Sequence, residues 1–221
     1  MRIALLLLAV SLAGAQTTNT IQASGSATRN VKPDMAQLTI GVVTDATTAQ
    51  AAADQNATLA DAVIKALTAV LGTGGSIETA YYSISPRYSN QPNTPPTVIG
   101  YTVSNTVQVT TTNVALVGKL IDAGNAAGAN TVSGPNFGLQ NSDPEVQLAL
   151  AAASKQALAH ASAIASGLGA KTGAVVSAQE ASTITPFLTG AAGAAGGAAT
   201  PIQTGTVSVS AHVTVTVAMV Q

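Results

Sequence analysis

The segment Thr206–Val220 reads TVSVSAHVTVTVAMV, and its alternation decides the kind of fold to expect. Apolar residues occupy every second position from Val207 to Met219, and Ser, Thr and His212 fill most positions between them. Successive side chains of a β-strand point to opposite faces, so this pattern predicts a strand with one covered and one polar face. The segment contains neither Lys nor Pro, which normally protect an exposed strand edge. We therefore expect this strand to be central in a sheet or paired across subunits.

Other parts of the chain show either the same alternation or a helical period. Alternation predicts further strands at Thr17–Thr28, Ala36–Thr44, Ser76–Tyr88, Val98–Thr112, Thr131–Leu139 and Lys171–Ala181. Apolar residues three and four positions apart predict helices at Asp45–Leu71, Asn113–Ala127 and Asp143–Ser166. The expected order is β-β-α-β-β-α-β-α-β-β, an α+β fold in which helices pack on one face of an antiparallel-rich sheet.

Turn and capping residues separate these elements. Asp45 or Thr47 is expected to cap the first helix, and the glycines of Gly72–Gly75 are expected to end it. Because proline fixes its own φ, Pro33-Asp34 predicts a structural turn between the first two strands.

The start of the third helix is expected at Asp143-Pro144-Glu145. Ser142 or Asp143 can cap it, and Pro144 suits its first turn. We interpret Asp143 and Glu145 as charges that favour the positive end of the helix dipole, and not as a catalytic pair of carboxylates.

The first fifteen residues have the three parts of a cleavable signal peptide. Arg2 supplies the positive charge, Ile3–Leu12 is apolar, and Ala13-Gly14-Ala15 is a small-x-small cleavage motif. A membrane anchor would need about 20 apolar residues. We therefore expect export, cleavage before Gln16, and a periplasmic or otherwise exported domain over residues 16–221. Within it, the Gly/Ala-rich segment 186–201 is expected to be a flexible loop.

Composition excludes several classes of function. Eight Lys and Arg residues against nine Asp and Glu give a net charge of −1, which does not favour nucleic acid as a partner. The absence of Cys excludes disulfides and thiol catalysis, and makes a structural zinc site improbable. The six aromatic residues are too few for a base-stacking platform or an aromatic sugar cleft: Tyr81, Tyr82, Tyr88, Tyr101, Phe137 and Phe187.

The two histidines give no sign of a catalytic or metal site. His160 lies within an alanine-rich predicted helix and His212 on the polar face of the last strand. Neither is spaced with a carboxylate as a general base or a metal ligand would require. We found no nucleophile elbow, zinc-protease motif or phosphate loop. The sequence therefore predicts no catalytic residue, no metal ligand and no cofactor.

Two positions in strands stand out for another reason. Gly25, inside the first strand, predicts a bulge or a close backbone contact. Tyr81 and Tyr82 should face opposite sides of their strand, one in the core and the other available as a contact residue.

Several segments together resemble the SIMPL-domain family of exported bacterial proteins. They include Ala23-Ser24-Gly25-Ser26-Ala27, Val31–Ala36, Ile84–Tyr88, Ile99–Val107 and Gly118–Gly124, followed by Gly128-Ala129-Asn130 and Phe137. The resemblance implies an exported α+β protein without known catalysis, related to the 26–28 kDa immunogenic, outer-membrane-associated proteins. It also implies self-association, because some members of the family assemble into rings.

These observations favour a non-enzymatic protein of the cell envelope that acts through self-assembly or binding. The expected partner is a second copy of the chain in a homo-oligomer, with another component of the cell envelope as the alternative, and no transmembrane span is expected after cleavage. Two alternatives remain. One is an envelope hydrolase that uses a Ser or Asp with His160 or His212. The other is a small-ligand carrier, which would need a deep apolar pocket.

Overall fold

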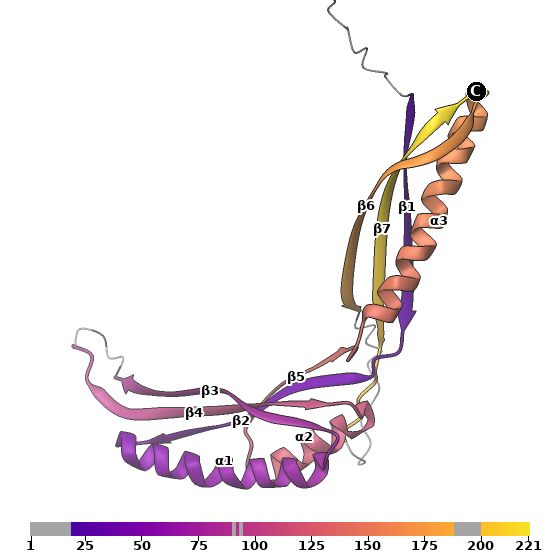
Figure 1. Ribbon diagram of the computed structural model, residues 1–221. Coiled ribbons are helices and arrows are strands. Elements are labelled where there is room, and N and C mark those ends of the chain that lie inside the picture. Colours follow the sequence, from indigo (N-terminus) through magenta and orange to yellow (C-terminus); the bar gives the residue numbers. More distant parts are fainter. Residues whose placement is uncertain (1–18, 90–91, 93–94, 188–199) are drawn as a thin grey trace, which may run out of the picture. The chain divides into compact units, whose positions relative to one another are not determined.

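The computed structural model describes residues 19–89, 92, 95–187 and 200–221 (Figure 1). The expected signal peptide and most of the Gly/Ala-rich segment therefore lie outside the described residues. The described chain forms two compact units. Unit 1 consists of residues 19–27, 150–181 and 211–221, and unit 2 consists of residues 28–149 together with the described part of 182–210.

The order of the elements agrees with the sequence prediction. They are β1 Thr20–Val31, β2 Met35–Ala46, α1 Ala49–Leu71, β3 Gly75–Tyr88, β4 Val98–Thr111, η1 Val114–Leu116, α2 Val117–Ala126, β5 Thr131–Gly138, α3 Asp143–Gly167, β6 Lys171–Phe187 and β7 Thr206–Val220. The α+β class is thus confirmed, with one addition. The strands form two sheets, in the orders β1-β7-β6 and β3-β4-β2-β5.

Strand β7 is the central strand of its sheet, which is the first of the two alternatives expected for Thr206–Val220. Its alternate apolar residues are buried: Val207, Val209, Ala211, Val213, Val215 and Val217. On the opposite face, hydroxyl groups bond to β1. Within unit 1, Ser24 and Thr214 lie 3.2 Å apart, and within unit 2, Thr28 and Ser210 lie 2.9 Å apart. The polar face of β7 therefore helps to hold its neighbour in the same chain.

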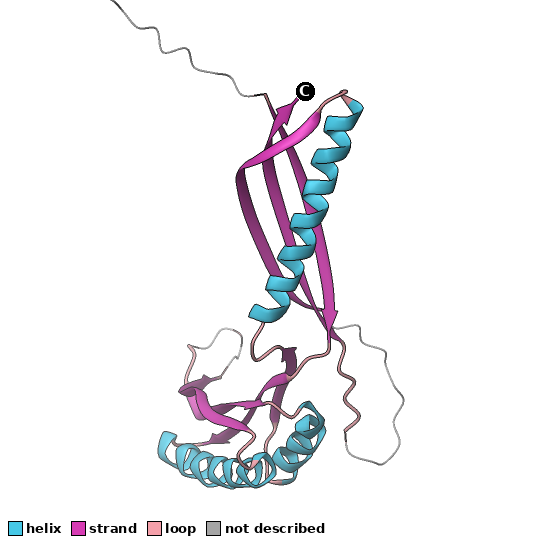
Figure 2. Cartoon of the chain, turned by 45° about the vertical axis from the view of Figure 1, so that its right-hand side comes forward, coloured by secondary structure: helices cyan, strands magenta, loops and turns pink. Residues whose placement is uncertain are grey.

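In unit 1, α3 packs on the sheet through its smallest residues (Figure 2). Every fourth residue of this part of the helix is a fully buried alanine: Ala153, Ala157, Ala161 and Ala165. A Cβ atom on Gly25 would lie 2.2 Å from the Ala153 carbonyl oxygen and 2.4 Å from the Ala157 nitrogen. Gly25 therefore marks a close backbone contact, as its position in a strand predicts.

In unit 2, α1 and α2 lie on one face of the four-stranded sheet (Figure 1). The core between them contains larger side chains than the helix contact of unit 1: Leu38, Ile40, Val42, Val63, Leu67, Val109, Leu120 and Phe137. Leu38, Ile40 and Val42 share the covered face of β2, while Gln37 and Thr39 lie on the other, as the alternation predicts.

The start of α1 corrects one expectation. The cap is Thr48, whose side chain accepts a hydrogen bond from the Ala51 nitrogen at 3.3 Å, and neither Asp45 nor Thr47. Strand β2 continues to Ala46 because Asp45 pairs with Thr102 of β4. The helix ends before Gly72, whose φ of 58° suits glycine, as expected.

The predicted turn at Pro33-Asp34 lies between β1 and β2. Its Asp34 nitrogen donates to the Gly138 oxygen at 3.1 Å, and its carboxylate accepts from the Gln140 nitrogen at 2.7 Å. These bonds hold the turn against the end of β5, which agrees with a structural role.

Candidate functional site

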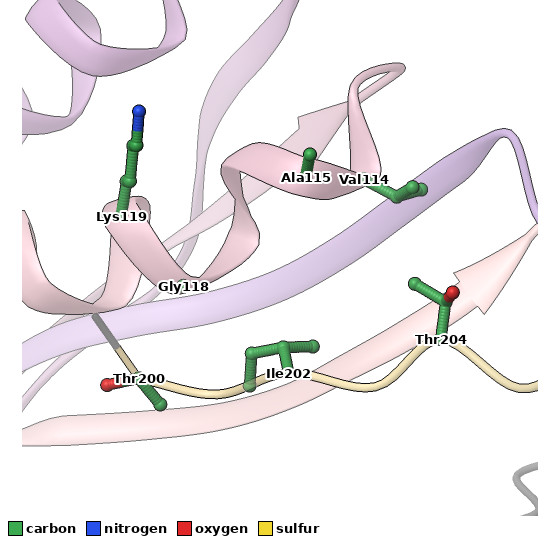
Figure 3. Close-up of a pocket in the computed structure, with 7 residues that line it drawn as sticks. All are labelled: Val114, Ala115, Gly118, Lys119, Thr200, Ile202 and Thr204. Carbon is green, nitrogen blue, oxygen red and sulfur yellow. The ribbon is translucent and has the colours of Figure 1, made fainter. Parts of the chain in front are cut away.

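A groove of about 420 Å³ lies in unit 2 beside the start of α2 (Figure 3). Its walls come from η1, α2 and the segment before β7: Val114, Ala115, Gly118, Lys119, Thr200, Ile202 and Thr204. In Figure 3 the side chain of Lys119 points away from residues 200–204. The groove therefore lacks the convergent polar groups that orient a small ligand.

One carboxylate holds the wall of this groove in place. Asp122 of α2 accepts hydrogen bonds from the Thr200 hydroxyl at 2.6 Å and the Thr200 nitrogen at 3.2 Å. A Cβ atom on Gly118 would lie 2.5 Å from the Thr200 oxygen, so only glycine allows this approach. These contacts explain the groove as the place where the chain passes along α2 before it enters β7.

The histidines are both in unit 1 and both exposed. His160 Nδ1 lies 2.8 Å from the Ser24 carbonyl oxygen. A carbonyl oxygen only accepts, so the ring nitrogen is the donor and His160 helps to fasten α3 to β1. Among the described residues, no group of three His, Asp or Glu side chains could hold a metal ion.

The acidic residues at the start of α3 have separate roles. Glu145 forms an ion pair with Arg29, with Oε2 2.6 Å from Nε. The backbone N–H of Asp143 donates a hydrogen bond to Asn141 Oδ1 at 3.0 Å. The backbone N–H of Val146 donates to the Ser142 oxygen at 3.0 Å, so Ser142 is the residue that precedes the helix. The helix dipole explains why acidic residues suit the start of α3. The hydrophobic periodicity of the sequence could not show that Glu145 would pair with Arg29.

The tyrosines gather on one hairpin, although they are few. All four tyrosines of the chain lie on β3 or β4. Tyr81 pairs with Thr106 on the uncovered face, and Tyr82 pairs with Asn105 on the helix-covered face. The two therefore face opposite sides as predicted, but the expectation that one belongs to the core is wrong. Tyr81 is 56% exposed and Tyr82 is 52% exposed.

The exposure of Tyr82 has a simple cause. Strand β3 is the edge strand of its sheet and nearly all of its residues are exposed. Helix α1, whose Asn56 bonds to Val42 of β2 and Val103 of β4, lies on the inner strands and leaves β3 and the adjoining start of β4 exposed. Large apolar side chains are exposed there, and we call this group the hairpin end: Tyr82, Ile84, Tyr88, Val98 and Ile99. Sequence alternation identified the strands but could not show where the helix stops covering them.

The uncovered face of the same sheet is polar and almost without charge. Paired rows of hydroxyl and amide side chains run across it: Ser83 with Ser104, Ser85 with Thr102, and Thr39 with Gln108. At one end the Thr102 hydroxyl donates to Asp45, and Arg87 Nη1 lies 3.6 Å from the same carboxylate. These uncharged polar rows, with one ion pair at the end, are typical of a sheet face that is exposed to solvent.

The two edges of this sheet differ. At the β5 edge, β5 pairs with β2 only as far as Gly41. Beyond it the Asn130 side chain accepts from Val43 N at 2.8 Å and donates to Val43 O at 2.7 Å, so it satisfies the next position of β2. At the other edge, β3 has 14 residues and no described strand beside it.

None of the described helices combines the length and the apolar character that crossing a membrane requires.

Comparison with known proteins agrees with these features. The SIMPL family, described as a protein of unknown function (DUF541), matches residues 21–217 and so includes parts of both units. The chain is 31% identical over 169 residues to the 26 kDa periplasmic immunogenic protein of Brucella melitensis biotype 1. The aligned part covers 72% of this chain and 66% of that protein, so the chain spans about two thirds of its relative's length. With the fold, the ordered motifs and this match together, the chain belongs to the SIMPL family.

Proposed function

We propose that this protein is exported to the periplasm and works there as a non-enzymatic component of the cell envelope that assembles with copies of itself. Export is supported by the charged, apolar and small-residue parts of the first fifteen residues. It is also supported by the relative in Brucella melitensis, whose name describes a periplasmic protein.

Assembly is supported by a single observation, the exposed hairpin end of unit 2. Ile84 is 44% exposed, and Tyr82 beside it is more than half exposed. Both lie on the face that α1 covers elsewhere, because Ile84 pairs with the buried Val103. An apolar surface that is continuous with a core, but lies on the edge strand beside the covering helix, is stabilised when a partner removes it from water.

The size of this surface fits a protein partner. Five half-exposed apolar side chains of this size present roughly 500 Å² in total, near the upper range for the largest patch on a monomer. A stable interface buries about 800 Å² on each partner. The hairpin end therefore supplies much of one interface, and flanking polar residues can supply the rest.

Light scattering on the native protein at micromolar concentration tests the proposal. We expect a mass that is a multiple of the monomer mass. The double variant Tyr82→Ser, Ile84→Ser should shift the mass to that of a monomer, because it removes the apolar contact and leaves the buried core unchanged. The matched control is Val175→Ser, Val176→Ser, since these two valines are equally exposed on β6 in unit 1. A monomeric unmutated protein would show that self-assembly is wrong.

Export has a separate test. The protein recovered from the envelope of the producing cell should begin at Gln16, which intact mass measurement shows directly. A retained Met1 would contradict the proposed processing and would leave the assembly proposal unaffected.

A further inference from the structure

We propose that the β3 edges of two copies pair antiparallel about a two-fold axis at Ser83, so that the two four-stranded sheets become one. The inference rests on the proposed self-assembly and specifies its interface. It is carried by the geometry of the β3 edge and by the distribution of charged and apolar residues along it.

No described strand pairs with β3 at this edge, and its central residues can pair there, although Pro86 has no N–H to donate. The bond from Thr112 N to Gly74 O, at 3.0 Å, shows that even-numbered residues of β4 direct their backbone groups toward β3. Ser104 therefore bonds toward Ser83, its register partner. Backbone groups alternate in direction along a strand, so those of Tyr82 and Ile84 point to the open edge. These two residues can each exchange a pair of backbone hydrogen bonds with a second copy.

The apolar residues are placed symmetrically about Ser83. Tyr82 pairs with Asn105 and Ile84 with Val103, one residue on either side of Ser104. A two-fold axis at Ser83 therefore sets Tyr82 opposite the partner's Ile84, twice, on the helix-covered face. Aromatic and β-branched residues in directly opposed positions stabilise antiparallel pairs. Both side chains, now about half exposed, would be covered by this contact.

The charges are placed symmetrically as well. Glu78 pairs with Gln108 and Arg87 with Gly100, so each lies four β4 residues from Ser104, in opposite directions. The two are nine residues apart in sequence, and the register shift between Thr79 and Tyr81 makes the distances equal and puts both on the uncovered face. The same axis therefore sets Glu78 opposite the partner's Arg87 at both ends of the seam.

This charge arrangement also selects the register. Arg87 already lies 3.6 Å from Asp45, but a guanidinium carries five N–H donors and remains half exposed. A shift of two residues would place Glu78 opposite Ser85 or Ser89 of the second copy and would lose both ion pairs. Charges on an edge strand normally prevent pairing, whereas here opposite charges meet only in the two-fold register. The β5 edge offers no equivalent, because the Asn130 side chain already bonds to both backbone groups of Val43 and β5 has no charged side chain to fix a register.

Cysteine cross-linking tests this register directly, because the chain contains no cysteine of its own. In the proposed pair the Cα atoms of Ser83 and the partner's Ser83 would be about 4.5 Å apart, within the range of a disulfide. The matched control is Ser85→Cys, because Ser85 would be separated from its copy by four residues, about 13 Å. We expect Ser83→Cys to form a covalent dimer under mild oxidation and Ser85→Cys to remain monomeric on a denaturing gel.

Charge exchange tests the same register in a second way. Glu78→Arg should lower the cross-linked yield of Ser83→Cys about fivefold, since it places like charges together at both ends. The double exchange Glu78→Arg, Arg87→Glu should restore it. Light scattering separates the two possible failures. A monomeric native protein overturns the proposed assembly, whereas an oligomer whose Ser83→Cys and Ser85→Cys variants cross-link equally overturns the β3 pairing alone.

Discussion

Helices α3 and α1 cover their sheets in different ways. In unit 1 the contact surface of α3 is a row of buried alanines that allows its backbone to approach Gly25 of β1. In unit 2, α1 is separated from the sheet by branched side chains, among them Val63, Leu67 and Leu71. The first contact is close because the side chains of α3 are short. The second is stabilised by large side chains that fill the space between helix and sheet.

This difference predicts opposite sensitivities. A close backbone contact has no room for an added atom, so unit 1 should be sensitive to enlargement. A core of large side chains leaves a cavity when one is shortened, so unit 2 should be sensitive to truncation.

The largest effect should come from truncation in unit 2. Leu67 is fully buried in the core between α1 and the sheet. Leu67→Ala should lower the free energy of unfolding by about 3 to 4 kcal/mol, from lost burial and a residual cavity. Urea denaturation measures the loss, and hydrogen exchange should increase in α1 and β2. The exposed Leu59 of the same helix is the control, since Leu59→Ala should cost less than about 1 kcal/mol.

A smaller loss should follow from one added methyl group in unit 1. Gly25→Ala places a Cβ within 2.4 Å of two backbone atoms of α3, which cannot rotate away. We expect a loss of about 2 to 3 kcal/mol, with faster hydrogen exchange in α3. Gly167→Ala is the control, because no neighbouring atom lies within 4 Å of its added Cβ. Equal stability of Gly25→Ala and the unmutated protein would contradict the close packing of β1 and α3.

The smallest effects concern two amides that fasten the helices. Asn56 of α1 is fully buried and donates to the carbonyl oxygens of Val42 at 2.9 Å and Val103 at 3.2 Å. Gln156 of α3 is exposed and accepts from Ser26 N at 2.7 Å. Asn56→Ala should cost about 2 kcal/mol, because it removes two buried hydrogen bonds to strand carbonyl oxygens and leaves a small cavity under α1. Gln156→Ala should cost less than about 1 kcal/mol, because water replaces its contact; denaturation midpoints of the two variants test this order.

Much of the fold could be predicted because it depends on local patterns. Alternation in Thr206–Val220 gave a strand with a covered face, and every residue of its valine row up to Val217 is buried. Gly72 ends α1 as expected, and Gly128 follows the end of α2, with φ values of 58° and 106°. These features follow from side-chain period and backbone sterics, which a single sequence contains.

The remaining features depend on partners distant in sequence. Alternation is the same whichever strand lies alongside, so it could not divide the strands between two sheets. The cap of α1 moved to Thr48 because pairing with β4 keeps Asp45 in a strand. The roles of Arg29, Asn130 and Asp122 each need a partner more than 75 residues away, for which local periodicity carries no signal.

At one position of β2, the Asn130 side chain makes the hydrogen bonds that a neighbouring strand would otherwise make. A carboxamide has the same donor and acceptor as a peptide group, so at Val43 it replaces the neighbour that β5 no longer supplies. An aspartate there would have the same shape but could not donate to the Val43 carbonyl. At this edge the hydrogen bonding of β2 is therefore completed one residue before β5 begins, by a single amide and without a charged residue or a proline.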